Sequence, residues 1–254
     1  MKSSAWWKLR SLLSPGLRPL RTRGLYVLGM HRSGTSCLTG LLETAGLFAG
    51  SVRGLYEDRS IRLLNRDLLA KAGGTWRDPP ERIEIGSEEA ARVRNALRPF
   101  SDHPEWILKD PRFLFTLDAW TAHTPNHRLV GTYRHPLSVA HSLEKRDRKL
   151  REEDRRKGES PLSVEEGVRI WCAYNRNLVR LQQQRGLPII DFDLDGPEYL
   201  ACLRKVFELL GLEYDSRAVA ERYDVDRISN RFADQDLSGE AKELYQALKG
   251  CALR

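Results

Sequence analysis

The stretch LYVLGMHRSGTSCLTGLLETAG, residues 25–46, decides the fold of this chain. It opens with four consecutive apolar residues, 25–28, which are typical of a strand buried on both faces of a parallel sheet. Leucines then recur at helical spacing until Gly46, a residue type that commonly ends helices. The order of strand, glycine-bounded loop and helix predicts the first βα unit of an α/β protein.

Strand-like runs return three times along the chain, at 106–108, 129–133 and 187–192, with helix-length stretches between them. This rhythm predicts a P-loop-type, three-layer αβα fold with a central parallel sheet and helical insertions. Helices are expected at 58–73, at 87–100, after the capping box of Ser163 and Glu166, and from Pro197 to Gly211. The charged segment 144–157 is expected to be a solvated helix end or a mobile loop.

The composition and charge describe a globular body behind a basic arm. Of the 254 residues, 41% are hydrophobic and 30% charged, enough for a single α/β domain over residues 24–254. The net charge is +7, but residues 1–23 contain six lysines and arginines and no acid. The body is therefore nearly neutral, and no nucleic-acid partner is expected. The arm could lie on an anionic membrane as a peripheral contact, or pack as a short helix on the body.

The chain lacks the apolar stretches that a signal peptide or a spanning helix of roughly 20 residues would need. Its four cysteines are widely spaced, with no cluster at zinc-binding spacing. These features predict reduced thiols, no metal site and a cytoplasmic location.

The loop GMHRSGTS, residues 29–36, is predicted to bind an anion. Successive backbone N–H groups and the positive end of the following helix favour a phosphate there. A Walker A loop would place lysine after Gly34, but Thr35 stands at that position and the cation is Arg32. Such a loop can hold a phosphate group without the lysine that grips a nucleoside triphosphate.

Two further cationic segments follow predicted strands. In RLVGTYRHPLSVAHSLEKR, residues 128–146, Arg134 leaves the strand, and Ser138, Ser142 and Arg146 follow on one helical face. In KDPR, Lys109 follows another strand, while Asp110 and Arg112 are expected to shape the turn or pair with each other. Since ligands of parallel sheets bind beyond the carboxyl ends of the strands, Lys109, Arg134 and the loop are expected to share one crevice.

Together these segments resemble the sulfotransferases that use 3′-phosphoadenosine 5′-phosphosulfate (PAPS), among them tyrosylprotein and bacterial sulfotransferases. The resemblance implies that PAPS is the co-substrate, that adenosine 3′,5′-bisphosphate (PAP) is the product, and that no metal takes part. It implies a 5′-phosphosulfate site formed by Arg32, Ser33, Gly34, Thr35 and Ser36. It also implies a 3′-phosphate site formed by Arg134, Ser142 and Arg146.

The same resemblance implies that sulfuryl transfer to an acceptor hydroxyl needs a base, for which Glu57 in GLYEDRS is the candidate. Glu57 or Asp58 could instead be a plain helix cap. Lys109 would sit near the bridging oxygen, and Arg32 would help to stabilise the transferring group. His31, His103 and His123 are rival bases.

The acceptor and the adenine contact are less sharply defined by the residues. Residues 50–100 should line the acceptor side, which would suit a carbohydrate, a lipid or another small molecule. Trp171 or the segment around Arg231 and Phe232 could stack on adenine, although Trp171 also fits a core helix face. Two alternatives stay open, namely a P-loop kinase with Asp191 or Asp193 near magnesium, and a nucleotide-binding protein without catalysis.

Overall fold

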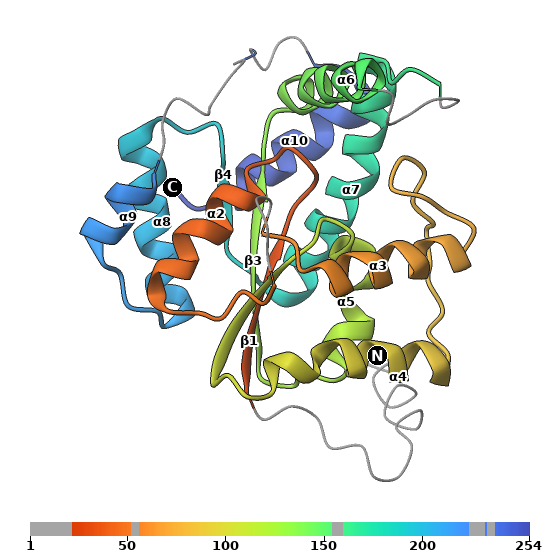
Figure 1. Cartoon of the computed structure of the whole chain (residues 1–254). Helices are drawn as coiled ribbons and strands as arrows, with labels where there is room; N and C mark the ends of the chain where they lie inside the picture. Colours follow the sequence, from red (N-terminus) through yellow and green to blue (C-terminus); the bar gives the residue numbers. More distant parts are fainter. Residues whose placement is uncertain (1–21, 52–55, 154–159, 224–231, 233–236) are drawn as a thin grey trace, which may run out of the picture. The chain divides into compact units, whose positions relative to one another are not determined.

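The computed structural model describes residues 22–51, 56–153, 160–223, 232 and 237–254. The chain has a mixed α/β fold whose four parallel strands lie in the order β2–β1–β3–β4 (Figure 1). The strands are β1 (Arg23–Leu28), β2 (Glu105–Lys109), β3 (His127–Tyr133) and β4 (Ile189–Asp191). The predicted α/β class with a central parallel sheet is confirmed.

Helices of the described residues lie between these strands and after β4. They are α2 (Thr35–Leu42), α3 (Arg59–Lys71), α4 (Ser87–Leu97), α5 (Phe113–Thr121), α6 (Pro136–Glu152), α7 (Val164–Arg185), α8 (Gly196–Leu210), α9 (Ser216–Arg222) and α10 (Gly239–Cys251), with short 3₁₀ turns η1 (Glu43–Ala45) and η2 (Arg98–Phe100).

The residues that cap the helices explain several of these boundaries. Asp58 accepts bonds from two amides of the first turn of α3, Ser163 accepts from Glu166 N, and left-handed Gly211 ends α8.

The chain divides into two compact units. The first unit comprises Met1–Tyr26 and Gly46–Arg128, and the second comprises Val27–Ala45 and Leu129–Arg254. Each has its own buried apolar residues, so each is described by itself.

The core of the first unit is built around Tyr26. Its ring makes edge contacts with Trp106 at 5.5 Å and with Phe113 at 5.2 Å, and its hydroxyl lies 2.9 Å from Thr124 Oγ1. A Cβ atom on Gly24 would lie 2.2 Å from the Trp106 ring, so only glycine leaves room for this indole. The aromatic packing fixes the start of β1 against β2.

In the second unit, β3 pairs in parallel with β4, with Tyr133 opposite Asp191 in the register. Helix α7 packs on α6 and on α10 (Figure 1). Gly167 allows α7 to approach α6, because a Cβ there would lie 2.8 Å from Ala140 Cα. This packing holds the start of α6 beside the end of β3.

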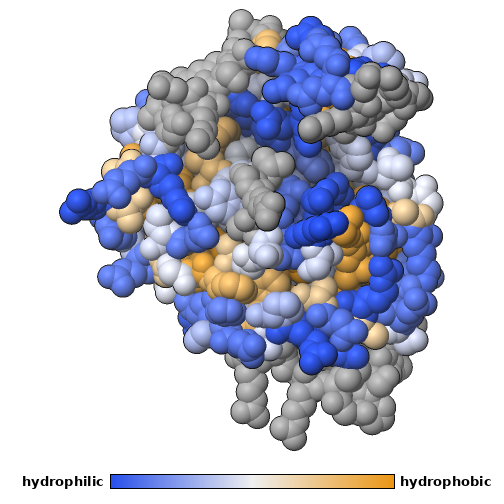
Figure 2. Space-filling model, in the orientation of Figure 1, coloured by the Kyte–Doolittle hydropathy of each residue, from blue (hydrophilic) through white to orange (hydrophobic). Residues whose placement is uncertain are grey.

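The charged segment 144–157 is helical as far as Glu152, where α6 ends, and residues 154–159 lie outside the described part. On the face seen in Figure 2, the area around α6 is strongly hydrophilic. The expectation of a solvated helix end is confirmed up to that point except at Asp147, which is buried and accepts from Arg151 Nε and Leu162 N.

All four cysteines are free thiols, as expected, with Cys172 and Cys202 buried. Within the described ranges, no helix has both the length and the apolar character required to cross a membrane. The basic arm, with its predicted boundary at residue 23, falls almost entirely outside the described residues, so its membrane contact stays a prediction.

Candidate functional site

The loop between β1 and α2 has a backbone that only certain residues can adopt. Gly34, the N-cap of α2, has a φ of 81°, and Arg32 has a φ of 67°, which is uncommon for a residue other than glycine. A Cβ on Gly34 would lie 2.1 Å from the Phe192 ring. Among the described residues, no side chain caps α2, so the first amides of this helix face the loop without a side-chain acceptor.

Ser33 lies at the centre of this loop and is fully buried. Its backbone is held on both sides, since its N–H donates to Met30 O at 3.3 Å and its carbonyl accepts from Thr132 Oγ1 at 3.1 Å. Its hydroxyl has no hydrogen-bond partner within the described residues. A buried hydroxyl of this kind is normally satisfied, so the loop offers a donor to a ligand.

Arg32 reaches from the loop to α6. Its Nε donates to Ser142 Oγ at 2.8 Å, across 110 positions of sequence. Partial burial, together with repulsion from Arg146 and Arg134, lowers the pKa of Arg32. The structure thus brings together the loop arginine and the three residues predicted to bind a second phosphate.

Arg134 is buried and has a carboxylate partner that the sequence reading missed. Its Nε donates to Asp193 Oδ1 at 2.8 Å, and its guanidinium lies 5.7 Å from the Phe192 ring centroid. The second oxygen of Asp193 accepts from His135 N, also at 2.8 Å. The sequence suggests Asp193 only as a magnesium ligand of a kinase, and the signal that could reveal this pairing is its place after a strand, like Arg134.

Asp191 is also engaged inside the second unit. It accepts a hydrogen bond from Tyr133 OH at 2.9 Å and another from Asp193 N at 2.9 Å. Burial raises the pKa of Asp191. The carboxylate oxygens of Asp191 and Asp193 therefore hold together the ends of β3 and β4 and the start of α6. Among the described residues, no group of three histidine, cysteine or carboxylate side chains is placed to hold a metal ion.

The two candidates for an adenine contact differ in their surroundings. Trp171 is fully buried, and its indole N–H donates to Arg134 O at 3.0 Å, so it belongs to the core. Phe232 stacks on His141, with the ring planes 9° apart, and on His135. Arg231 lies outside the described residues.

In the first unit, Glu57 and Lys109 form an ion pair with 2.9 Å between Oε1 and Nζ. Their side chains are 12% and 2% exposed. Burial lowers the pKa of Lys109, an effect that Glu57 opposes. Asp58 supplies the helix cap, with Ser60 N at 2.9 Å from its Oδ1, so Glu57 is not used as a cap.

Asp110 and Arg112 pair with each other, one of the two expected readings. Arg112 N and Nη1 lie 2.8 and 3.1 Å from Asp110 Oδ1. Burial raises the pKa of Asp110, and the charge of Arg112 opposes this. The pair shapes the turn that follows Lys109.

The three histidines that are rival candidates for the base lie in environments that differ from one another. His103 stacks on Phe48 with 3.5 Å between ring centroids, and burial lowers the pKa of His123. His31 makes an edge contact with Tyr174 at 5.8 Å. His31 belongs to the second unit, and the other two histidines belong to the first.

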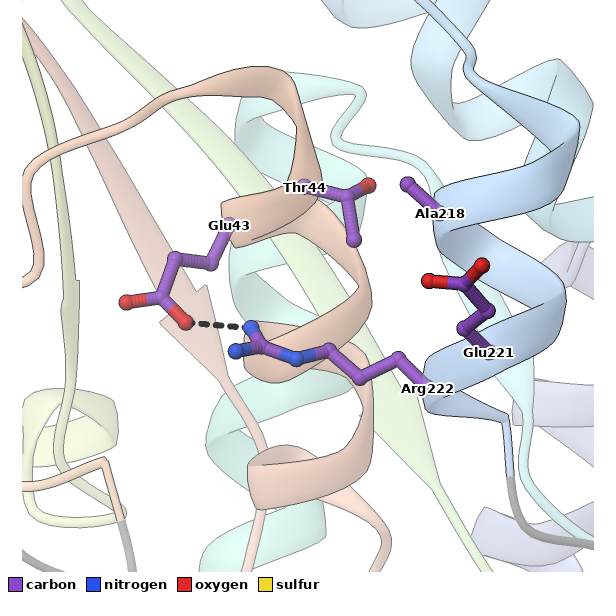
Figure 3. A pocket seen from close by; sticks show the side chains of 5 residues that line it. All are labelled: Glu43, Thr44, Ala218, Glu221 and Arg222. Carbon is purple, nitrogen blue, oxygen red and sulfur yellow. Dashed lines mark hydrogen bonds and ion pairs between the residues drawn. The ribbon is translucent and has the colours of Figure 1, made fainter.

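A separate hollow of about 470 Å³ lies between η1 and α9 (Figure 3). Arg222 spans it, donating to Glu43 Oε2 at 2.5 Å and to Gly40 O at 3.1 Å. Since α2 rises about 1.5 Å per residue, its two ends lie about 12 Å apart. The hollow is at the C-terminal end of α2 and is therefore not part of the loop site.

Comparison with known proteins shows the fold. No family model matches the sequence, and no curated protein matches it significantly. The structure is similar to a sulfotransferase domain from the curacin biosynthetic pathway, with a TM-score of 0.51 and 16% identity over 91% of this chain and 92% of that one. It is also similar to the sulfotransferase STF9 from Mycobacterium avium, with a TM-score of 0.51 and 15% identity over 96% of this chain and 78% of that one. At this identity the likeness establishes the sulfotransferase fold.

Proposed function

From this fold, we propose that the protein is a sulfotransferase that moves the sulfuryl group of PAPS to an acceptor hydroxyl. The observation that carries the proposal is the arrangement in the second unit. There the loop arginine, Arg32, contacts Ser142 and interacts with Arg134 and Arg146. A concentration of positive charge beside an uncapped helix start suits a nucleotide with more than one phosphate.

The loop is assigned to the 5′-phosphosulfate. The amides at the start of α2, the buried Ser33 hydroxyl and the side chains of Thr35 and Ser36 would donate to its oxygens. Gly34 matters because its φ of 81° and the Phe192 ring against its Cα leave room only for glycine at the turn that presents these donors. These donors stabilise charge where it develops during transfer.

Glu57 and Lys109 are assigned to the chemical step. The acceptor oxygen forms a bond to sulfur as the bond from sulfur to the bridging oxygen breaks, and Glu57 takes the proton of the hydroxyl. Protonation neutralises Glu57 and weakens its ion pair with Lys109, which can then donate to the bridging oxygen of the leaving PAP. Burial lowers the pKa of Lys109, which makes it a better proton donor to that oxygen.

For the acceptor, we propose a carbohydrate, lipid or other small-molecule hydroxyl. The first unit offers Trp76, with the Arg77 guanidinium 5.6 Å from its ring centroid, between α3 and α4. Flat aromatic and cationic side chains of this kind suit polar ring-shaped ligands.

A thermal shift panel followed by a transfer assay tests the proposal. PAP should raise the melting temperature of the full chain, and Mg-ATP should not. Transfer of labelled sulfate from PAPS to a panel of sugars and lipids should then yield a sulfated product. Stabilisation by Mg-ATP alone would favour a kinase, and PAP binding without any transfer would favour a nucleotide-binding protein without catalysis.

A further inference from the structure

Asp110 and Arg112, in the turn after β2, are charged residues to which the proposed reaction gives no role. The Asp110 side chain is 0% exposed and that of Arg112 is 12% exposed. The Arg112 guanidinium donates to both oxygens of Asp110, at 3.1 and 3.3 Å, and the Arg112 amide donates to Oδ1 at 2.8 Å. A turn can form without a fully buried charge, so the placement of this carboxylate next to Lys109 indicates a second role.

The two residues complete a charge cluster, which also contains Glu57 and Lys109. Glu57 is 2.9 Å from Lys109, and its charge raises the pKa of Asp110 as well. Burial raises the pKa of Asp110 further, but the N–H donors of Arg112 favour its ionised form. With all its members ionised the charge cluster is neutral, which is the condition under which charges are tolerated in a protein interior.

Lys109 depends on the anions of the charge cluster to stay protonated. Burial lowers its pKa, Glu57 and Asp110 raise it, and Arg112 lowers it by less than Asp110 raises it. Glu57 cannot give this support throughout the reaction, because it is assigned to take the proton of the acceptor and is then neutral. Asp110 is therefore the anion that remains beside Lys109 when its proton is needed.

We propose that Asp110 is a positioning residue of the transfer step, which keeps Lys109 protonated until the bridging oxygen takes the proton, and that Arg112 keeps Asp110 ionised. The inference rests on the proposed function and deepens its chemical step. Asp110 and Arg112 act through Lys109 and are assigned no contact with the reacting atoms. Among the described residues, the charges that act on Lys109 come from Glu57, before α3, and from this turn after β2.

Asp110→Asn tests the proposal, because asparagine keeps the shape and can still accept from Arg112 but carries no charge. In the full chain without nucleotide, NMR of lysine labelled with ¹³C at Cε follows the titration of Lys109, and Lys109→Met identifies its signal. The midpoint should fall by about 1 pH unit in Asp110→Asn. It should not move in the control Asp102→Asn, which removes an exposed acid separated from Lys109 by the length of β2, about 16 Å.

The pH profile of sulfate transfer gives the second measurement. With PAPS and an acceptor from the panel, kcat/KM should fall at high pH as Lys109 loses its proton. In Asp110→Asn this fall should move to lower pH by the same amount as the NMR midpoint. A role confined to shaping the turn would instead lower kcat/KM over the whole pH range and leave the NMR midpoint in place.

The double variant Asp110→Asn with Arg112→Met keeps the test decisive if the single variant does not fold. It removes both charges of the pair, so no uncompensated arginine is left behind. Because Asp110 acts on the pKa of Lys109 more strongly than Arg112 does, the NMR midpoint of the double variant should lie below that of the wild type. It should also lie above that of Asp110→Asn, from which only the anion is missing.

The outcomes separate this inference from the proposed function. An unchanged Lys109 midpoint in Asp110→Asn, or a midpoint in the double variant at or above that of the wild type, would overturn the inference. So would a shifted NMR midpoint with an unshifted pH profile. A chain that transfers no sulfate would refute the proposed function, and the NMR midpoints would still show whether Asp110 sustains the charge of Lys109.

Discussion

Arg134 and Asp193 form an ion pair, with 2.8 Å between Nε and Oδ1, that joins the ends of β3 and β4. The side chains are 5% and 13% exposed, so removal of either partner leaves a poorly solvated charge. Asp193 also accepts from His135 N, the N-cap position of α6. One carboxylate therefore fixes both Arg134 and the start of the helix that carries Ser142.

Asp193→Ala should lower the free energy of unfolding by about 3 kcal/mol, because it strands Arg134 and an amide of the α6 start. Urea unfolding followed by circular dichroism measures this. Asp195→Ala is the matched control, since the Asp195 side chain accepts from Glu198 N as the cap of α8 and its removal should cost about 1 kcal/mol. Equal losses in the two variants would contradict a special role for the ion pair.

Gly34→Ala should destabilise the protein more than Gly46→Ala. Both glycines have a φ of 81°, so the backbone cost of about 1 to 2 kcal/mol is shared. Only at Gly34 would the new Cβ meet another group, the Phe192 ring, which should add about 1 to 3 kcal/mol. Chemical denaturation of both variants gives the difference, and indistinguishable values would show that Phe192 moves aside freely.

Glu57→Gln should reduce sulfate transfer by at least about 100-fold, since an amide cannot accept the acceptor proton. The rise in melting temperature on PAP addition should persist, because Glu57 is assigned no nucleotide contact. Glu88→Gln serves as the control, as Glu88 is an exposed first-turn residue of α4. Full turnover in Glu57→Gln would show that another group, with His31 the first to test, is the base.

Lys109 should make stability depend on pH in the alkaline range. Burial lowers its pKa in the folded state, so between that lowered value and the ordinary value of about 10.5 the folded state binds fewer protons than the unfolded state. Raising the pH through this window should therefore stabilise the wild type relative to Lys109→Met. Unfolding free energies of both proteins from about pH 8 to about pH 10 test the sign.

The matched control for that series is Lys149→Met, which removes an exposed lysine of α6 whose side chain is 75% exposed. Its stability should follow the wild type across the same range. A pH dependence that is the same in Lys109→Met and the wild type would mean that Lys109 is not the group responsible.

Local signals in the sequence were enough to predict many elements. Asp58 and Ser163 begin helices where their capping patterns place them, and Gly211 ends α8 as expected. The reading missed α5 because FLFTLDAWT is apolar on nearly all sides and shows no helical stripe. It also missed α9, whose seven residues are too few for a clear period, and α10.

For the site, the residue types were predictable and their pairings were not. The sequence placed Lys109, Arg134 and the loop at strand ends, but it treated Glu57 and Lys109 separately, and the structure joins them in an ion pair. The bonds from Arg32 to Ser142 and from Arg134 to Asp193 span 110 and 59 positions. Side-chain direction at such separations is set by tertiary packing, which no local pattern reports. That Lys109 and Arg134 face one crevice stays a prediction.

The long reach of the loop contacts has a consequence for biosynthesis. Residues 29–36 leave the ribosome early, yet Ser33 O is held by Thr132 and Arg32 by Ser142, near the middle of the chain. Arg134 gains its carboxylate partner later still, once Asp193 has been synthesised. Because chains emerge N-terminus first at about 5 to 20 residues per second, the nascent polypeptide spends several seconds with this loop unsupported. Ribosome-bound fragments that stop short of Asp193 should thus be unable to recognise nucleotide, even though the whole glycine-rich segment has already been made.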